Sequence, residues 1–197
     1  MFGLEIEFIT DKAKLFEALR LNDIPYVYYN QMKTPKHDII VLKKESTLKD
    51  SNGIEINFPP CGDFAFIERV LTILNQLDVI FNARCALHVH VGVDDAAKLR
   101  RIHTYYCDHQ EEIISQASHL YVNLNRPTLL SDNYLTGKCR NINVYNAYKN
   151  HQTVEHRIYK ATIDIDEVKF CINQTLQIIE AALNETPGGQ ENEISNY

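Results

Sequence analysis

The sequence lacks the features that mark several common classes of protein. Its apolar runs are only a few residues long, whereas a membrane-spanning helix needs roughly 18. No CxxC pair occurs among its five scattered cysteines, so neither a disulfide framework nor a cysteine-based zinc site is expected. The pattern GxxxxGK[ST] is also missing, and its absence excludes a P-loop nucleotide site.

The chain also has fewer basic than acidic residues. The chain has 20 Lys and Arg against 26 Asp and Glu, a formal charge of −6. Nucleic-acid-binding domains usually show a basic footprint, so we expect no nucleic-acid partner. The first seven residues include Glu5 and Glu7 and no basic segment, so we expect no signal peptide. Together with the free cysteines, these features predict a cytoplasmic protein that does not bind membranes.

The residues that are present fit one folded domain. A chain of 197 residues with 45% apolar residues has the length and composition of a single globular domain. Strand and helix patterns interleave without a linker, which predicts one α+β domain over residues 1–184. Residues 185–197 contain Pro-Gly-Gly and three acids, and we expect them to form a mobile tail.

Periodicity predicts the individual elements, since alternation is typical of strands and a 3.6-residue period of helices. Strands are expected over residues 2–9, 25–30, 38–43, 53–58, 84–93, 141–145 and 152–160. Helices are expected over residues 11–21, 63–78, 94–107, 108–119 and 164–184, the second with Asp63 as a candidate N-cap.

Four of the expected strands carry charged or polar side chains on one face. Residues i and i+2 of a strand share a face, so each of these strands has one apolar face that packs on helices and one polar face. The polar faces carry Glu5 with Glu7, Glu55 with Asn57, His88 with His90, and Glu155 with Arg157 and Tyr159.

If these strands share one sheet, their carboxylates and imidazoles converge. Each pattern alone is common: ExE and HxH occur on solvated faces, and ExR forms salt-bridge ladders. Together they are unusual, because the strand centres lack the Lys, Thr, Ser and Gln of an ordinary wet face. Grouped carboxylates repel one another unless a cation lies between them. Carboxylate oxygens with an imidazole predict Mg²⁺ or Mn²⁺ rather than structural zinc.

Five motifs occur in the order FGLEIEF (2–8), NGIEINFPP (52–60), CALHVHVG (85–92), KCRNINVYN (138–146) and TVEHRIYKATID (153–164). Together they resemble the amidoligase family, the carboxylate–amine ligases related to glutamine synthetase and glutamate–cysteine ligase. The resemblance implies a curved, mainly antiparallel sheet, a glutamine-synthetase-like half-barrel, with helices packed on its convex face. It also implies that ATP phosphorylates a substrate carboxylate, and that an amine then displaces phosphate to form an amide.

The resemblance also implies roles for individual residues. The implied Mg²⁺ ligands are Glu5, Glu7, Glu55, His88 and Glu155. Arg157, Arg140 and His88 would act in catalysis. Lys43, Lys44 and His90 would contact ATP together with the two arginines, and Glu45 would be a further ligand. The chemistry needs such residues, because phosphoryl transfer depends on positioning and charge stabilisation by metals and arginines.

The chain departs from the family pattern, and alternatives follow from that. It is short, and residues 41–48 (VLKKESTL) lack the usual Asp-Gly-Ser. One alternative is a Zn²⁺- or Mn²⁺-dependent hydrolase that uses the His and Glu residues. Another is a non-catalytic relative that binds a peptide or protein.

The substrates are predicted only by class. Residues 121–150 carry four basic residues against one acid, so they either bind an anion or form an ordinary polar loop. An anion site there would suit a small-molecule or peptide carboxylate substrate, to be joined to an amine. The open sheet edges of a half-barrel favour a homo-oligomer.

Overall fold

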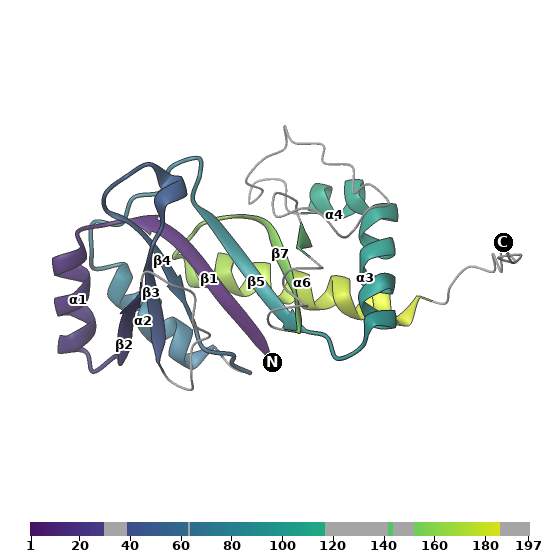
Figure 1. Ribbon diagram of the computed structural model, residues 1–197, viewed down its shortest axis with the longest axis horizontal. Helices are drawn as coiled ribbons and strands as arrows, with labels where there is room; N and C mark the ends of the chain where they lie inside the picture. The colour runs from purple at the N-terminus through teal and green to yellow at the C-terminus, as the bar shows by residue number, and fades with distance from the viewer. Residues whose placement is uncertain (30–38, 63, 117–141, 144–151, 186–197) are drawn as a thin grey trace, which may run out of the picture.

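One mixed sheet runs through the centre of the structure (Figure 1). The computed structural model describes residues 1–29, 39–62, 64–116, 142–143 and 152–185. Within these ranges, seven strands are hydrogen-bonded in the order β2-β3-β4-β1-β5-β7-β6. Strands β2 and β3 are parallel, and the other neighbouring pairs are antiparallel. The predicted α+β class is confirmed, with a sheet that is mixed and mainly antiparallel.

The observed elements follow the predicted ones closely. The strands are β1 (Phe2–Ile9), β2 (Tyr26–Tyr29), β3 (Ile40–Lys44), β4 (Gly53–Asn57), β5 (Ala86–Gly92), β6 (Ile142–Asn143) and β7 (Thr153–Lys160). The helices are α1 (Lys12–Leu21), α2 (Ala65–Leu74), α3 (Ala96–Asp108), α4 (Gln110–Gln116), α6 (Ile165–Asn184) and the short 3₁₀ helix η1 (Ser46–Leu48). No helix in these ranges has both the length and the apolar character to cross a membrane.

Aspartates set the start of three helices. Asp11, Asp95 and Asp164 are the N-caps of α1, α3 and α6, and their carboxylates accept hydrogen bonds from two, one and two backbone N–H groups of the first turn, respectively. Such caps satisfy donors that have no partner inside the helix. Helix α2 is shorter than predicted and has Phe64 at its N-cap position without a side-chain hydrogen bond. The candidate cap Asp63 lies outside the described residues.

The apolar core lies on one side of the central strands. Figure 1 shows α2 and α6 running behind the sheet. Leu4, Ile6 and Phe8 of β1 are buried in one cluster with Val70 of α2 and Ile172 of α6. Because side chains alternate along β1, Glu5 and Glu7 lie on the face turned away from this core. The fold thus leaves the polar side of the central strands available for a site.

A β-bulge in β7 changes the predicted side of one residue. Val89 of β5 lies opposite His156, and Leu87 lies opposite Tyr159, so β7 has one more residue than β5 between these pairs. Beyond the bulge, the alternation therefore shifts by one position. The prediction that Tyr159 shares the face of Glu155 was wrong. Tyr159 is fully buried, and its hydroxyl lies 3.0 Å from Oγ1 of Thr175 in α6.

The C-terminal end of α6 is held by α3. The backbone carbonyls of Leu183 and Glu185 accept hydrogen bonds from the Arg101 guanidinium at 2.6 and 2.7 Å. The Glu185 carboxylate lies 3.5 Å from Nε2 of His109. Glu185 is the first residue of the predicted tail, and the rest of that tail, residues 186–197, lies outside the described residues.

Candidate metal centre

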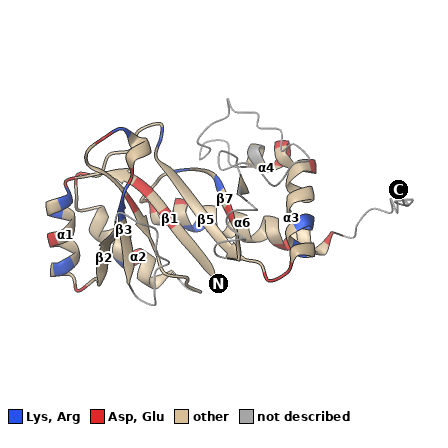
Figure 2. Ribbon diagram, in the orientation of Figure 1, with Lys and Arg blue, Asp and Glu red and all other residues tan. Residues whose placement is uncertain are grey.

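Four adjacent strands bring the predicted polar residues together. In the order β4, β1, β5 and β7, the register places Glu7 opposite Glu55, Glu5 opposite His88, and His90 opposite Glu155. Figure 2 shows acidic positions within β1 and β7 near the middle of the sheet. The strands are far apart in the chain, so only the sheet makes these residues neighbours.

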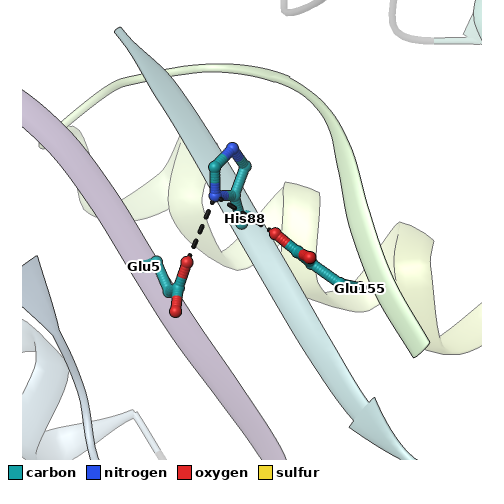
Figure 3. Close-up of side chains that lie close together, drawn as sticks. All are labelled: Glu5, His88 and Glu155. Atoms are coloured by element: carbon teal, nitrogen blue, oxygen red, sulfur yellow. Dashed lines mark hydrogen bonds and ion pairs between the residues drawn. The ribbon is translucent and has the colours of Figure 1, made fainter. Parts of the chain in front are cut away.

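The first group of ligands, here called the histidine cluster, consists of Glu5, His88 and Glu155 (Figure 3). One ligand atom from each lies within 4.8 Å of the other two. Nδ1 of His88 is 3.3 Å from Oε2 of Glu5 and 3.5 Å from Oε1 of Glu155. The side chain of His88 is only 2% exposed. The imidazole is therefore held between two carboxylates in a site with little water.

Two further residues border the histidine cluster. Nε2 of His90 lies 3.5 Å from Oε1 of Glu5, and its Nδ1 lies 3.3 Å from Oγ1 of Thr153. The guanidinium of Arg157 forms a close ion pair with Oε1 of Glu155. Arg157 thus lies at the edge of the cluster, with about a third of its side chain exposed.

The second group, here called the carboxylate cluster, consists of Glu7, Glu45 and Glu55. Their ligand oxygens also lie within 4.8 Å of one another. Glu7 accepts a hydrogen bond from the backbone N–H of Ala86 at 3.0 Å. Glu45 accepts one from the N–H of Thr47 at 2.7 Å and so caps η1. Glu5 and Glu7 are two residues apart on β1, so the two clusters are neighbours.

Lys43 contacts the carboxylate cluster, whereas Lys44 does not. Lys43 lies opposite Glu55 in the sheet and donates hydrogen bonds to Glu55 Oε1 and Asn57 Oδ1, both at 2.7 Å. Asn57 also donates to the same Glu55 oxygen at 2.6 Å. Lys44 lies opposite Ile54, on the other side of the strand, and is exposed. Of the two lysines predicted to contact ATP, only Lys43 therefore lies at the candidate centre.

The environment of Glu5 favours its charged form. Burial opposes ionisation, but the hydrogen bonds and charges of His88 and His90 outweigh it and hold the pKa of Glu5 well below its usual value. Burial similarly opposes a charge on His90, yet Glu5 and Glu155 raise the pKa of His90. The histidine cluster thus keeps an ionised carboxylate ready to bind a cation.

Glu7 lies in the opposite electrostatic situation. Burial, together with the charges of Glu45 and Glu55, raises the pKa of Glu7 to about 7, although the charge of His88 opposes this shift. Carboxylates that crowd one another without a cation between them disfavour a second negative charge. The raised pKa of Glu7 therefore reflects its burial first and, less strongly, the charges of Glu45 and Glu55.

The donor atoms of both clusters fit a hard divalent cation. Five carboxylates and one imidazole make oxygen the main donor, as Mg²⁺ and Mn²⁺ prefer. Described cysteines do not take part: Cys85 and Cys171 are buried free thiols, as the cysteine pattern predicted. Zinc sites of the structural kind usually include thiolates, and neither cluster has one.

Some predicted site residues are not placed, and two contacting residues were not predicted. Arg140 lies outside the described residues, as does the basic segment 121–150 apart from residues 142–143. Asn57 and Thr153 were not assigned a role, although both contact candidate ligands. The alternation of β4 already placed Asn57 beside Glu55. Alternation also placed Thr153 on the face of Glu155, two residues further along β7, but only strand pairing brings it to His90.

Comparison with known proteins does not identify a family. No protein-family model matches the sequence, and a comparison with curated proteins finds no significant relative. The resemblance to amidoligases therefore stays a prediction. The candidate metal centre is assigned on its geometry alone.

Proposed function

We propose that the protein is an ATP-dependent carboxylate–amine ligase that uses Mg²⁺. The observation that carries this proposal is the pair of neighbouring ligand clusters on one sheet face, with a lysine and an arginine at their edges. Phosphoryl transfer uses these components: carboxylates to hold metal ions, and cationic side chains to contact phosphate oxygens.

The charge of the centre explains why such a site would need metal ions. The five glutamates of the two clusters carry five negative charges when ionised, and Lys43 and Arg157 return two positive charges. The remaining three negative charges would repel a triphosphate. Two divalent cations would leave one net positive charge. A chain of net charge −6 can therefore bind a nucleotide while remaining unsuited to nucleic acid.

The finer architecture is part of the same proposal. In a glutamine-synthetase-like half-barrel, the sheet is curved, the helices cover its convex face and the concave face holds the nucleotide. The position of α2 and α6 behind the sheet supports this arrangement, because the two clusters lie on the face turned away from the core. The open sheet edges support self-association as a homo-oligomer.

The reaction needs positioned charges rather than a protein nucleophile. The substrate carboxylate attacks the γ-phosphorus of ATP, and ADP leaves. The amine then attacks the acyl carbon, phosphate leaves, and an amide remains. Bound Mg²⁺ would neutralise the phosphate oxygens. Arg157, oriented by its ion pair with Glu155, would direct its guanidinium at the transferring phosphoryl group. His88 and Glu5 would hold the metal in a fixed position.

The histidine cluster also favours a second candidate function. One imidazole between two carboxylates is a donor set that a hydrolytic Zn²⁺ or Mn²⁺ site can use. Arg157 and Lys43 favour the ligase, because simple hydrolysis needs fewer groups that bind phosphate. A non-catalytic relative would keep the clusters but produce no ADP.

Thermal unfolding with different ligands tests the proposal directly. A ligase should be stabilised by ATP with Mg²⁺ and less by AMP, because a ligand that binds only the native state raises the melting temperature. A hydrolase should be stabilised by Zn²⁺ or Mn²⁺ and gain no further stability when ATP is added. Absence of stabilisation by ATP with Mg²⁺ would exclude the ligase.

A second experiment tests the residues. The double variant Glu5→Gln/Glu155→Gln should lose ADP release in a screen of amino-acid pairs and still fold. Glu17→Gln is the matched control, because Glu17 is an exposed glutamate on α1 away from both clusters. Unfolding of the double variant would instead assign Glu5 and Glu155 a structural role.

A further inference from the structure

Lys43 forms an ion pair with one ligand of the carboxylate cluster, Glu55. Its ammonium group is 2.7 Å from Glu55 Oε1 and 2.7 Å from Asn57 Oδ1. The side chains of Lys43 and Glu55 are each only 12% exposed. A lysine whose side chain can reach solvent usually extends its ammonium group into water. Here the ammonium is instead held between one oxygen of Glu55 and one oxygen of Asn57.

The other oxygens of this cluster are also partly engaged. Glu7 accepts a backbone hydrogen bond from Ala86, and Glu45 accepts one from Thr47. Each of the three carboxylates therefore already has one oxygen in use. A divalent ion that binds through Oε1 of Glu55 must displace the ammonium or share that oxygen with it.

The histidine cluster differs in the chemistry of its neighbours. Glu5 is contacted by the imidazoles of His88 and His90, which compete with a metal ion only while they are protonated and become metal ligands once they lose the proton. An ammonium group has no lone pair, so it competes with a metal ion and cannot coordinate one. Arg157 competes for Glu155, but Glu5 and His88 have no Lys or Arg contact among the described residues.

We propose that Lys43 is an internal competitor for the cation at the carboxylate cluster, so that divalent ions fill the histidine cluster first. This inference rests on the metal-dependent function proposed above. The second ion would bind well only together with a polyphosphate, because the phosphate oxygens give the displaced ammonium a new anionic partner. Lys43 would thereby couple filling of the second cluster to arrival of the nucleotide.

Titration with Mn²⁺, followed by electron paramagnetic resonance of the free ion, tests the competition without any activity assay. The wild-type protein should show one tighter site and a second that is at least about tenfold weaker, since a unit charge near a divalent ion repels it strongly. Lys43→Met should strengthen the second site about tenfold or more. Addition of tripolyphosphate should strengthen it in the wild type and much less in the variant.

Three further variants make the outcome specific. Lys44→Met is the matched control, because Lys44 lies on the opposite side of β3, and it should bind Mn²⁺ as the wild type does. Lys43→Arg should keep the second site weak, because it retains the charge. Lys43→Gln removes the charge but keeps an amide that can bond to Glu55 and Asn57, so it replaces Lys43→Met if that variant fails to fold.

The possible results separate this inference from the proposed function. Equal second-site affinity in the wild type and in the folded, uncharged Lys43 variants would overturn the competition and leave the metal centre standing. Absence of Mn²⁺ binding to the wild-type protein at millimolar concentrations would overturn the metal-dependent function, and the competition with it.

Discussion

At the scale of single residues, the clearest feature is the contrast between Glu5 and Glu7. They lie two positions apart on β1 and face the same side, yet their pKa values shift in opposite directions. Glu5 is surrounded by imidazoles, and Glu7 by buried surface and two other carboxylates. The same side chain is therefore ionised in one position and close to half-protonated in the other at neutral pH.

This contrast predicts that Glu7→Gln stabilises the metal-free protein at high pH. Burial raises the folded-state pKa of Glu7 from 4.5 to about 7, so its stabilising contribution is complete below about pH 4.5 and is lost as the pH rises through 7. Glu7→Gln has no carboxyl group at this position, so its stability does not fall in this way as the pH rises. Its free energy of unfolding, relative to wild type, should therefore increase by up to about 3 kcal/mol between pH 4.5 and 7.5.

Urea denaturation in the presence of a chelator measures this difference. Glu17→Gln, on the exposed side of α1, should show almost no pH-dependent difference from wild type. A difference for Glu7→Gln that stays flat over this pH range would show that Glu7 keeps an ordinary pKa in the folded protein.

A second residue-scale prediction concerns Gln174 of α6. Its side chain is 5% exposed, and neither amide atom has a hydrogen-bond partner in the described ranges. An unsatisfied buried polar group costs roughly 1–3 kcal/mol. Gln174→Met keeps a similar length and helix propensity, so it should raise the free energy of unfolding by about 1 kcal/mol. Chemical denaturation measures this, and a loss of stability would show that the amide is hydrogen-bonded in solution.

At the scale of elements, strand alternation predicted most of what positions the site. The apolar spacing of β1, β4 and β5 placed Glu5, Glu55 and His88 on the face away from the core, as observed. Periodicity along one strand reports the side on which a residue lies. It carries no information about which strands are neighbours, so the separation into two clusters could not be predicted.

The register of β3 and the bulge in β7 account for the remaining differences between the predicted and the observed positions of residues. Both lysines of β3 were candidates because the family resemblance did not distinguish between them, and pairing with β4 selects Lys43. Tyr159 was assigned to the wrong side because a single extra residue in β7 reverses the alternation beyond it. Bulges depend on how two strands pair, so a pattern within one strand does not reveal them.

The start of α6 gives an element-scale prediction. Asp164 accepts hydrogen bonds from the backbone N–H groups of Asp166 and Glu167, and its side chain is the only cap of that helix end in the described residues. Asp164→Ala should lower the free energy of unfolding by about 1 kcal/mol. Asp166→Ala is the control: it removes one exposed acid near the helix start and should cost less than half as much. Equal losses in thermal denaturation would show that charge, and not capping, stabilises this end.

At the scale of the whole molecule, the candidate centre joins parts of the chain that are distant in sequence. The histidine cluster takes one residue each from β1, β5 and β7, three adjacent strands of the sheet. A cation bound there would connect these strands directly. Opening any one of these strands would then break the site, so a bound metal ion should slow backbone amide hydrogen exchange in all three strands together.

Hydrogen exchange tests this coupling. At a Mn²⁺ concentration about 100 times the dissociation constant, binding should add about 2.7 kcal/mol to the free energy of opening of β1, β5 and β7. Removal of the ion with a chelator should reverse the effect, and Glu5→Gln/Glu155→Gln should not show it. Protection confined to one strand would contradict a site shared by the three.

The position of β1 also bears on how the chain folds as it is synthesised. β1 precedes the other strands of the sheet in the chain but lies in the interior of the sheet, between β4 and β5. It cannot complete its pairing until residues 53–57 and 86–92 have been made, and Glu155 arrives later still. Sheets built from such distant contacts fold slowly compared with helical bundles. The residues of the histidine cluster can therefore come together only after β7 has been made, and a metal ion would act on chains that already contain the whole sheet rather than on the first steps of folding.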